Sequence, residues 1–178
     1  MASDIKTIRP HNLLIMGLIL IGIFSRFAPH LPNATPLIAL ALFGGTYLSR
    51  RWAILLPLTI VVVSDVVIGL HSTILFTWGA FALTGMIAWW IRLHPSPSRI
   101  VSGALLGSVL FFLITNFGVW FIANMYPLTI AGLWQCYVAA VPFFRSSLMA
   151  DIVYTALFFG CYALLKHPRA AIATSESK

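Results

Sequence analysis

Six apolar runs occupy most of this 178-residue chain. A membrane helix needs about 20 mostly apolar residues and satisfies its own backbone hydrogen bonds, so each run is a candidate spanning helix. With 60% hydrophobic and 8% charged residues, the chain cannot hide its apolar surface from water. We therefore predict an all-α membrane protein, one integral domain over residues 1–178 with tails at 1–11 and 167–178. The runs are residues 12–28, 36–48, 52–70, 73–91, 100–123 and 146–165.

The basic residues predict the orientation of these runs. Nine of the eleven Lys and Arg residues fall in every second gap or in the tails, and the remaining gaps hold only Arg26 and Arg145. Cytoplasmic loops carry such an excess of positive charge, which predicts six spans with both termini in the cytoplasm. The basic residues lie mainly in pairs at span ends, where lipid headgroups suit them. Membrane lipids are thus expected partners, and nucleic acid is not.

Two runs leave alternatives open. Residues 36–48 would rise only about 20 Å as a helix, so this run either begins with the preceding loop folded into the protein or does not cross alone. A break at Gly44-Gly45 is also compatible with the sequence. The first run follows Lys6 and Arg9 and resembles a secretory signal peptide. Because no convincing small-x-small cleavage site follows, we expect a retained helix.

An aromatic segment, residues 124–145, separates the last two runs. Trp and Tyr favour the headgroup region, so one interpretation is an interfacial belt or a helix lying on the membrane. The other interpretation is a lid over a pocket. The tail from His167 is short and polar, and we expect it to be disordered. The aromatic residues of the segment are Tyr126, Trp134, Tyr137, Phe143 and Phe144.

Polar residues gather toward the predicted outer face and form the candidate site. Ionisable groups inside a membrane are costly unless they are paired or face water. Asp65 and Asp151 fall at a depth similar to Arg26 and Arg145, so the four either neutralise one another or contact a ligand. The candidate substrate-binding residues are Arg26, His30, Asn33, Asp65, His71, Asn116, Trp120, Asn124, Arg145, Asp151 and Tyr154.

Two stripes of these residues have helical spacing. Asn116, Trp120 and Asn124 recur at i, i+4 and i+8, and Asp151 and Tyr154 belong to a second stripe. Amides beside an aromatic ring suit a flat, polar solute, whereas hydrogen bonds between helices are the alternative explanation. The convergence of the stripes favours a pocket.

Signatures of cofactor chemistry are weak. His30 and His71 lack a metal-binding spacing, and haem ligation by this pair remains only an alternative. Cys136 and Cys161 would lie at different depths, so we expect neither a disulfide nor a metal pair. We find no nucleophile elbow, phosphate-binding loop or zinc-protease motif. The sequence thus predicts no metal, no cofactor and no enzyme activity.

Small residues mark the inner half. Ala41 and Gly45, and likewise Gly103 and Gly107, are spaced four apart, which lets helices approach closely. Packing within the chain is the default explanation. The alternative is a face that docks on a partner membrane protein.

Several segments resemble a family of small bacterial membrane proteins of unknown function, described as candidate transport proteins. They are RFAPHLPNATP at 26–36, ALALFGG at 39–45, Ser64-Asp65 with GLH at 69–71, TNFGVW at 115–120, MYP at 125–127 and the stretch 142–154. This family in turn is similar to the substrate-binding S components of energy-coupling factor (ECF) vitamin transporters. The resemblance covers nearly the whole chain.

The resemblance implies six helices in the bacterial cytoplasmic membrane around an outward-facing pocket for a vitamin-like solute. The first outer loop would close the pocket. The inner face would dock on a transmembrane coupling protein with two ATPase subunits. The first helix offers Gly17 and Gly22 in place of the Ala-x-x-x-Ala contact motif, so the small pairs of the second and fifth helices become the candidate docking residues.

We therefore expect a solute-binding subunit for uptake of a small polar or aromatic metabolite. An intramembrane enzyme, with Asp65 or Asp151 as general base, is one alternative. A structural or assembly subunit, whose polar residues merely hold six helices together, is the other.

Overall fold

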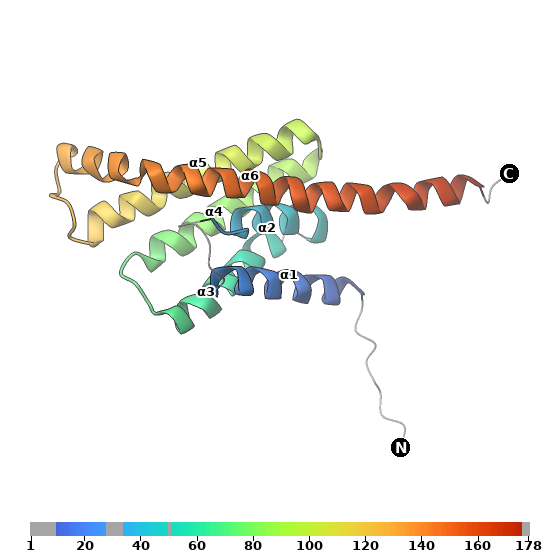
Figure 1. Cartoon of the computed structure of the whole chain (residues 1–178), viewed down its shortest axis with the longest axis horizontal. Helices are drawn as coiled ribbons and strands as arrows, with labels where there is room; N and C mark the ends of the chain where they lie inside the picture. The colour runs from blue at the N-terminus through green and yellow to red at the C-terminus, as the bar shows by residue number, and fades with distance from the viewer. Residues whose placement is uncertain (1–9, 28–33, 50, 176–178) are drawn as a thin grey trace, which may run out of the picture.

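The computed structural model describes residues 10–27, 34–49 and 51–175, and their side chains over 14–27, 34–49 and 51–164. These residues form helices and no strands, so the all-helical prediction is confirmed (Figure 1). Three helical stretches, Ile74–Leu93, Pro97–Ile122 and Ile130–Leu164, are long and apolar enough to cross a membrane. The elements are α1 (Pro10–Phe27), α2 (Leu37–Phe43), the π-helical turn η1 (Gly44–Leu48), α3 (Trp52–Ile68), α4 (Ile74–Leu93), α5 (Pro97–Ile122) and α6 (Ile130–Ser175).

Local sequence explains where helices begin and end. The Ser96 side chain accepts a hydrogen bond from the Arg99 backbone N–H at 3.3 Å and caps α5, whose first residue is Pro97. Helix α3 stops at Gly69, whose φ of 124° suits glycine alone. Helices α1, α3, α4 and α5 begin and end within three residues of the predicted runs.

The helices alternate in direction along the bundle. In Figure 1 the α3–α4 and α5–α6 connections lie at one end, and the α4–α5 connection lies toward the other end, on the side to which the C-terminal part of α6 extends. We call the first the outer end and the second the inner end. At the inner end the Arg92 guanidinium donates to the Gly45 carbonyl at 3.3 Å, and Arg99 lies over the Trp90 ring.

Helix α2 forms the centre of the bundle. All seven of its residues are buried, and Leu40 and Leu42 have no exposed surface at all. Every other helix packs against it. This part of the second run is therefore covered on all sides by other helices of the same chain.

The break considered at Gly44-Gly45 is present as a change of helix type. The α-helix gives way at Gly44 to the π-helical turn η1. A Cβ atom on Gly45 would lie 2.5 Å from the Cβ atoms of Ala53 and Ala88. The absence of a side chain thus lets η1 approach α3 and α4, but 36–48 is not one uniform α-helix.

The small residues of the inner half pack inside the chain. Ala41, Gly45, Gly103 and Gly107 are all buried. A Cβ on Gly103 would lie 2.5 Å from Ile91, and one on Gly107 would lie 3.1 Å from Ile38 and Thr84. Neighbouring helices cover these four residues, which favours packing within the chain over the alternative of a docking face.

The boundaries predicted for the last helix were wrong at both ends. Helix α6 begins at Ile130, continues through Pro142 and Arg145, and reaches Ser175. Its first turns pack along α5, where Tyr137 donates to the Leu113 carbonyl at 2.8 Å. The aromatic segment is therefore largely part of a long helix rather than a separate helix lying on the membrane. The expected disordered tail is helical as far as Ser175.

Candidate functional site

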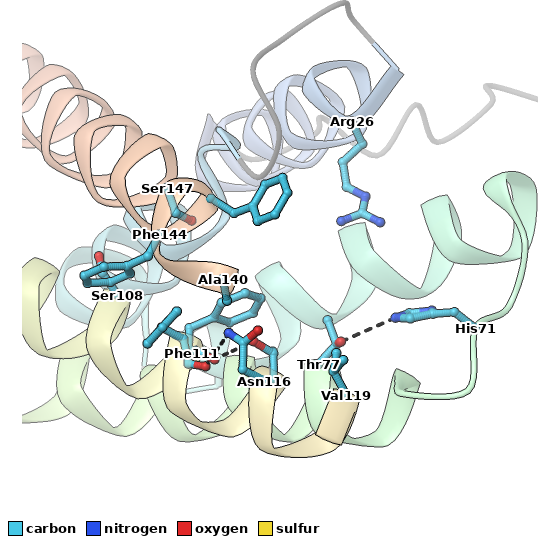
Figure 2. Close-up of a pocket in the computed structure, with 13 residues that line it drawn as sticks. Arg26, His71, Thr77, Ser108, Phe111, Asn116, Val119, Ala140, Phe144 and Ser147 are labelled. Carbon is cyan, nitrogen blue, oxygen red and sulfur yellow. Dashed lines mark hydrogen bonds between the residues drawn. The ribbon is translucent and has the colours of Figure 1, made fainter. Parts of the chain in front are cut away.

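A cavity of about 310 Å³ opens at the outer end of the bundle (Figure 2). Four phenylalanine rings and several polar groups surround it, and we call it the outer cavity. Arg26 enters from α1, His71 from the α3–α4 connection and Thr77 from α4, while α5 and α6 supply the other walls. Its lining is Arg26, His71, Thr77, Ser108, Phe111, Phe112, Thr115, Asn116, Val119, Ala140, Phe143, Phe144 and Ser147.

The α5 and α6 walls each follow one helical face. The α5 lining residues recur at intervals of three and four, as do those of α6, which is the spacing of one face of an α-helix. Phenylalanine rings and short polar side chains share the α5 face, and on α6 two phenylalanines are followed by Ser147. Phe112 also packs against Phe144 with ring centroids 4.7 Å apart, so the two walls meet. Such a lining offers stacking surfaces together with hydrogen-bonding groups.

An ion pair supports the α1 side of the outer cavity. Nη2 of Arg26 lies 2.5 Å from Oδ1 of Asp65, and the Trp78 indole N–H donates to Oδ2 of the same carboxylate at 3.1 Å. Asp65 is 2% exposed and does not line the cavity itself. Among the described residues, the buried Nε of Arg26 has no hydrogen-bond partner. Asp65 thus holds Arg26, and Arg26 faces the cavity.

A second carboxylate lies beside the outer cavity in a smaller space. Asp151 is 2% exposed, and its Oδ2 lies 2.7 Å from the Ser108 hydroxyl. It lines a void of about 60 Å³, which we call the inner recess. The recess and the outer cavity share Arg26, Phe111 and Ser147 as lining residues, so they adjoin one another.

The structure brings five of the predicted site residues to this region. Arg26, His71 and Asn116 line the outer cavity, Asp151 lines the inner recess, and Asp65 stands behind Arg26. His71 Nε2 lies 3.4 Å from the Thr77 hydroxyl, and the Asn116 amide donates to the Phe112 carbonyl at 2.8 Å. Figure 2 shows His71 and Thr77 on one side of the cavity and Phe144 and Ser147 on the other.

Four other predicted residues do not line this cavity. Helix α5 ends at Ile122, and Asn124 follows it with a φ of 54°, so the predicted stripe over Asn116, Trp120 and Asn124 is broken. Trp120 instead donates to the Pro127 carbonyl at 3.0 Å. Tyr154 stacks on Phe158. Arg145 is exposed, and of the neutralising pairs that the four charged residues allowed, the described side chains form Arg26–Asp65.

The remaining predicted residues, His30 and Asn33, lie outside the described residues. The sequence reading missed the part that aromatic residues on α5 play in the site. The signal was available, because residues 108, 111, 112, 115, 116 and 119 keep helical spacing through the fifth run. The helical spacing alone did not single out these residues, because phenylalanine is expected on any face of a membrane span.

Comparisons with known proteins identify a family and no function. A family model described as "Family of unknown function (DUF6580)" matches residues 6–173. Neither the search of curated proteins nor the search of solved structures gave a match.

Proposed function

Because this chain belongs to DUF6580, a family of unknown function, we propose its function from the geometry of the outer cavity. The protein is a membrane-embedded binding subunit for a small solute that carries a flat ring and polar groups. In this proposal the protein binds the solute and does not convert it chemically. The observation that carries the proposal is one cavity in which four phenylalanine rings stand among hydrogen-bonding side chains from several helices.

The size and position of the cavity support this function. A volume of about 310 Å³ lies at the small end of the range for ligand pockets. It opens at the end of the bundle opposite to Arg92 and Arg99, which the excess of basic residues assigns to the cytoplasm. The cavity then faces outward in a multi-pass protein of the bacterial cytoplasmic membrane, as uptake requires.

Uptake against a gradient needs an energy source. In the proposed assembly a transmembrane coupling protein and ATPase subunits supply it, as in the ECF transporters that the sequence resembles. The interface with them lies elsewhere than on Ala41, Gly45, Gly103 and Gly107, because these residues are buried.

The direct test is mass spectrometry of small molecules released from the purified, detergent-solubilised protein. The wild type is compared with Phe112→Ala, which opens the cavity wall, and with Arg145→Ala, which changes an exposed residue outside the cavity. A compound retained by the wild type and Arg145→Ala but lost from folded Phe112→Ala supports solute binding. Equal retention by all three proteins places the binding site elsewhere.

A structural role is the second candidate, and the Arg26–Asp65–Trp78 contacts favour it. They join α1, α3 and α4 without a ligand. Under this alternative, cavity variants lower thermal stability, and no compound from a metabolite library raises it. Stabilisation of the wild type by one compound, absent in Phe112→Ala, excludes this role as the sole function.

A further inference from the structure

Of the two acidic side chains that the structure describes, one has a basic partner and the other does not. Asp65 is ion-paired with Arg26. Asp151 is equally buried but has no basic partner among the described side chains. An isolated carboxylate removed from water is costly, so such a group takes up a proton or an external cation.

The Ser108 hydroxyl is placed to accept a hydrogen bond from a protonated Asp151. It lies 2.9 Å from the Ala104 carbonyl oxygen and 2.7 Å from Oδ2 of Asp151. A hydroxyl has one proton, and a carbonyl oxygen can only accept. If Ser108 donates to Ala104, the short contact with Asp151 requires the carboxyl group to donate. A neutral Asp151 would complete this chain of two hydrogen bonds, whereas an ionised Asp151 accepts the Ser108 proton itself.

The other groups around Asp151 do not supply a spare positive charge. Among the residues that the structure describes, the inner recess receives one charged side chain from a neighbouring helix, Arg26 of α1, and Asp65 already neutralises it. His71 faces the outer cavity, not the recess. Elements α2, α4 and α5 present hydroxyl or apolar groups, and on α6 the nearby titratable residue Tyr154 packs on Phe158. The lining of the recess is Arg26, Thr35, Leu37, Ile38, Phe81, Phe111, Ser147 and Asp151.

The recess adjoins the proposed solute site. At about 60 Å³ it has room for about two water molecules, and it shares Phe111 and Ser147 with the outer cavity. Phenylalanine rings attract cations through their faces. A solute with a positive group near Asp151 and a ring among the phenylalanines would therefore match both the charge and the surface of the site.

From this arrangement we propose that Asp151 is a proton-binding site and that the outer cavity takes a cationic organic amine in exchange for that proton. The inference rests on the proposed function and adds the charge class of the solute. On binding, one proton leaves the Asp151 carboxyl group for solvent, and the ammonium group of the solute supplies the counter-charge. When the solute leaves, the carboxyl group takes up a proton again.

The test uses three probes that share one ring: tryptamine, a cation at neutral pH, tryptophol, which is neutral, and indole-3-propionate, an anion. Binding to the purified protein is measured by equilibrium dialysis at several pH values. Tryptamine is expected to bind best. Because it competes with one proton, its affinity should fall by about tenfold for each unit of decrease in pH, once Asp151 is mostly protonated. Asp151→Asn should lose both the preference for tryptamine and the pH dependence, and keep tryptophol binding.

Infrared spectroscopy of the same samples tests the proton site without a ligand. The wild type at neutral pH should show the C=O stretch of a protonated carboxyl group, absent in Asp151→Asn and retained in Ser108→Ala, which keeps the carboxyl group. Absence of this band from the wild type overturns the inference. So does tryptamine binding that is independent of pH or unchanged in folded Asp151→Asn, or a failure of tryptamine to bind.

The inference and the proposed function can fail separately. If mass spectrometry finds an anionic or neutral solute that requires Phe112, the proposed function stands and the exchange is wrong. If no probe binds and no compound co-purifies, both are contradicted.

Discussion

Arg26 on α1 is ion-paired with Asp65 on α3 at 2.5 Å, and this contact decides how α1 joins the bundle. Helix α1 packs mainly on α3 and only slightly on α2. The same carboxylate accepts the Trp78 indole N–H from α4. One buried carboxylate thus gathers three helices at the outer end and fixes the guanidinium that faces the cavity.

Removing one partner of this pair should destabilise the protein more than removing both. Asp65→Asn leaves the guanidinium of Arg26, which is 20% exposed, without its counter-charge, and we expect this to lower the free energy of unfolding by about 3 kcal/mol. The double variant Arg26→Leu/Asp65→Leu should lose less stability than either Arg26→Leu or Asp65→Leu alone. Thermal unfolding in detergent, analysed as a double-mutant cycle, measures the coupling. Additive losses would show that the two side chains do not interact.

Asn116 should contribute to solute binding, whereas Asn124 should not. Asn116 lines the outer cavity, while Asn124 lies exposed beyond the end of α5. One lost hydrogen bond corresponds to about a tenfold decrease in affinity. We therefore expect about tenfold less co-purified solute with Asn116→Ala and an unchanged amount with Asn124→Leu, by quantitative mass spectrometry. A larger loss of co-purified solute with Asn124→Leu would indicate that the solute binds near the α5–α6 connection.

Adding a methyl group at Gly45 should destabilise the bundle, and adding one at Gly79 should not. A Cβ at Gly45 would meet Ala53 and Ala88 at 2.5 Å, whereas one at Gly79 has no neighbour within 4 Å. Overpacking of this kind costs about 1 to 3 kcal/mol. Gly45→Ala should lower the melting temperature in detergent, and Gly79→Ala should stay within about 1 kcal/mol of wild type. Normal stability of Gly45→Ala would reopen the question of a docking role.

The two ends of the bundle should be accessible from opposite sides of the membrane. In a background with Cys136→Ser and Cys161→Ser, single cysteines are placed at Asn124 and Ser98, both exposed at opposite ends. A membrane-impermeant maleimide should label Asn124→Cys in intact cells and Ser98→Cys only in inverted vesicles. The reverse result would invert the orientation and make the outer cavity cytoplasmic.

The positions of most helices could be predicted from the sequence, because long apolar runs indicate helices. Helix α6 is the exception. Pro142 and Arg145 are ordinary stop signals, yet α5 covers one side of this stretch and keeps it helical. Contacts between α5 and α6 therefore determine where α6 begins, and the local sequence pattern does not indicate such contacts.

The site was predicted in part. Because charged groups are costly in a membrane, Asp65 and Asp151 were predicted as site residues. This argument did not show which arginine pairs with which aspartate. Arg26 pairs with Asp65 across 39 residues, while Arg145 points elsewhere although only six residues separate it from Asp151. A separation of six places two side chains on different faces of a helix, and this geometry argues against the pair once the segment is known to be continuous.

The complete burial of α2 has a consequence for how the protein is made. Its sequence leaves the ribosome before α3, α4, α5 and α6, the helices that later surround it. Until they arrive, its apolar surface must be sheltered by lipid or by the insertion machinery. Synthesis therefore has to proceed almost to the end before the centre of the molecule reaches its final surroundings, and a truncation that removes α6 is expected to leave α2 exposed as a substrate for membrane quality control.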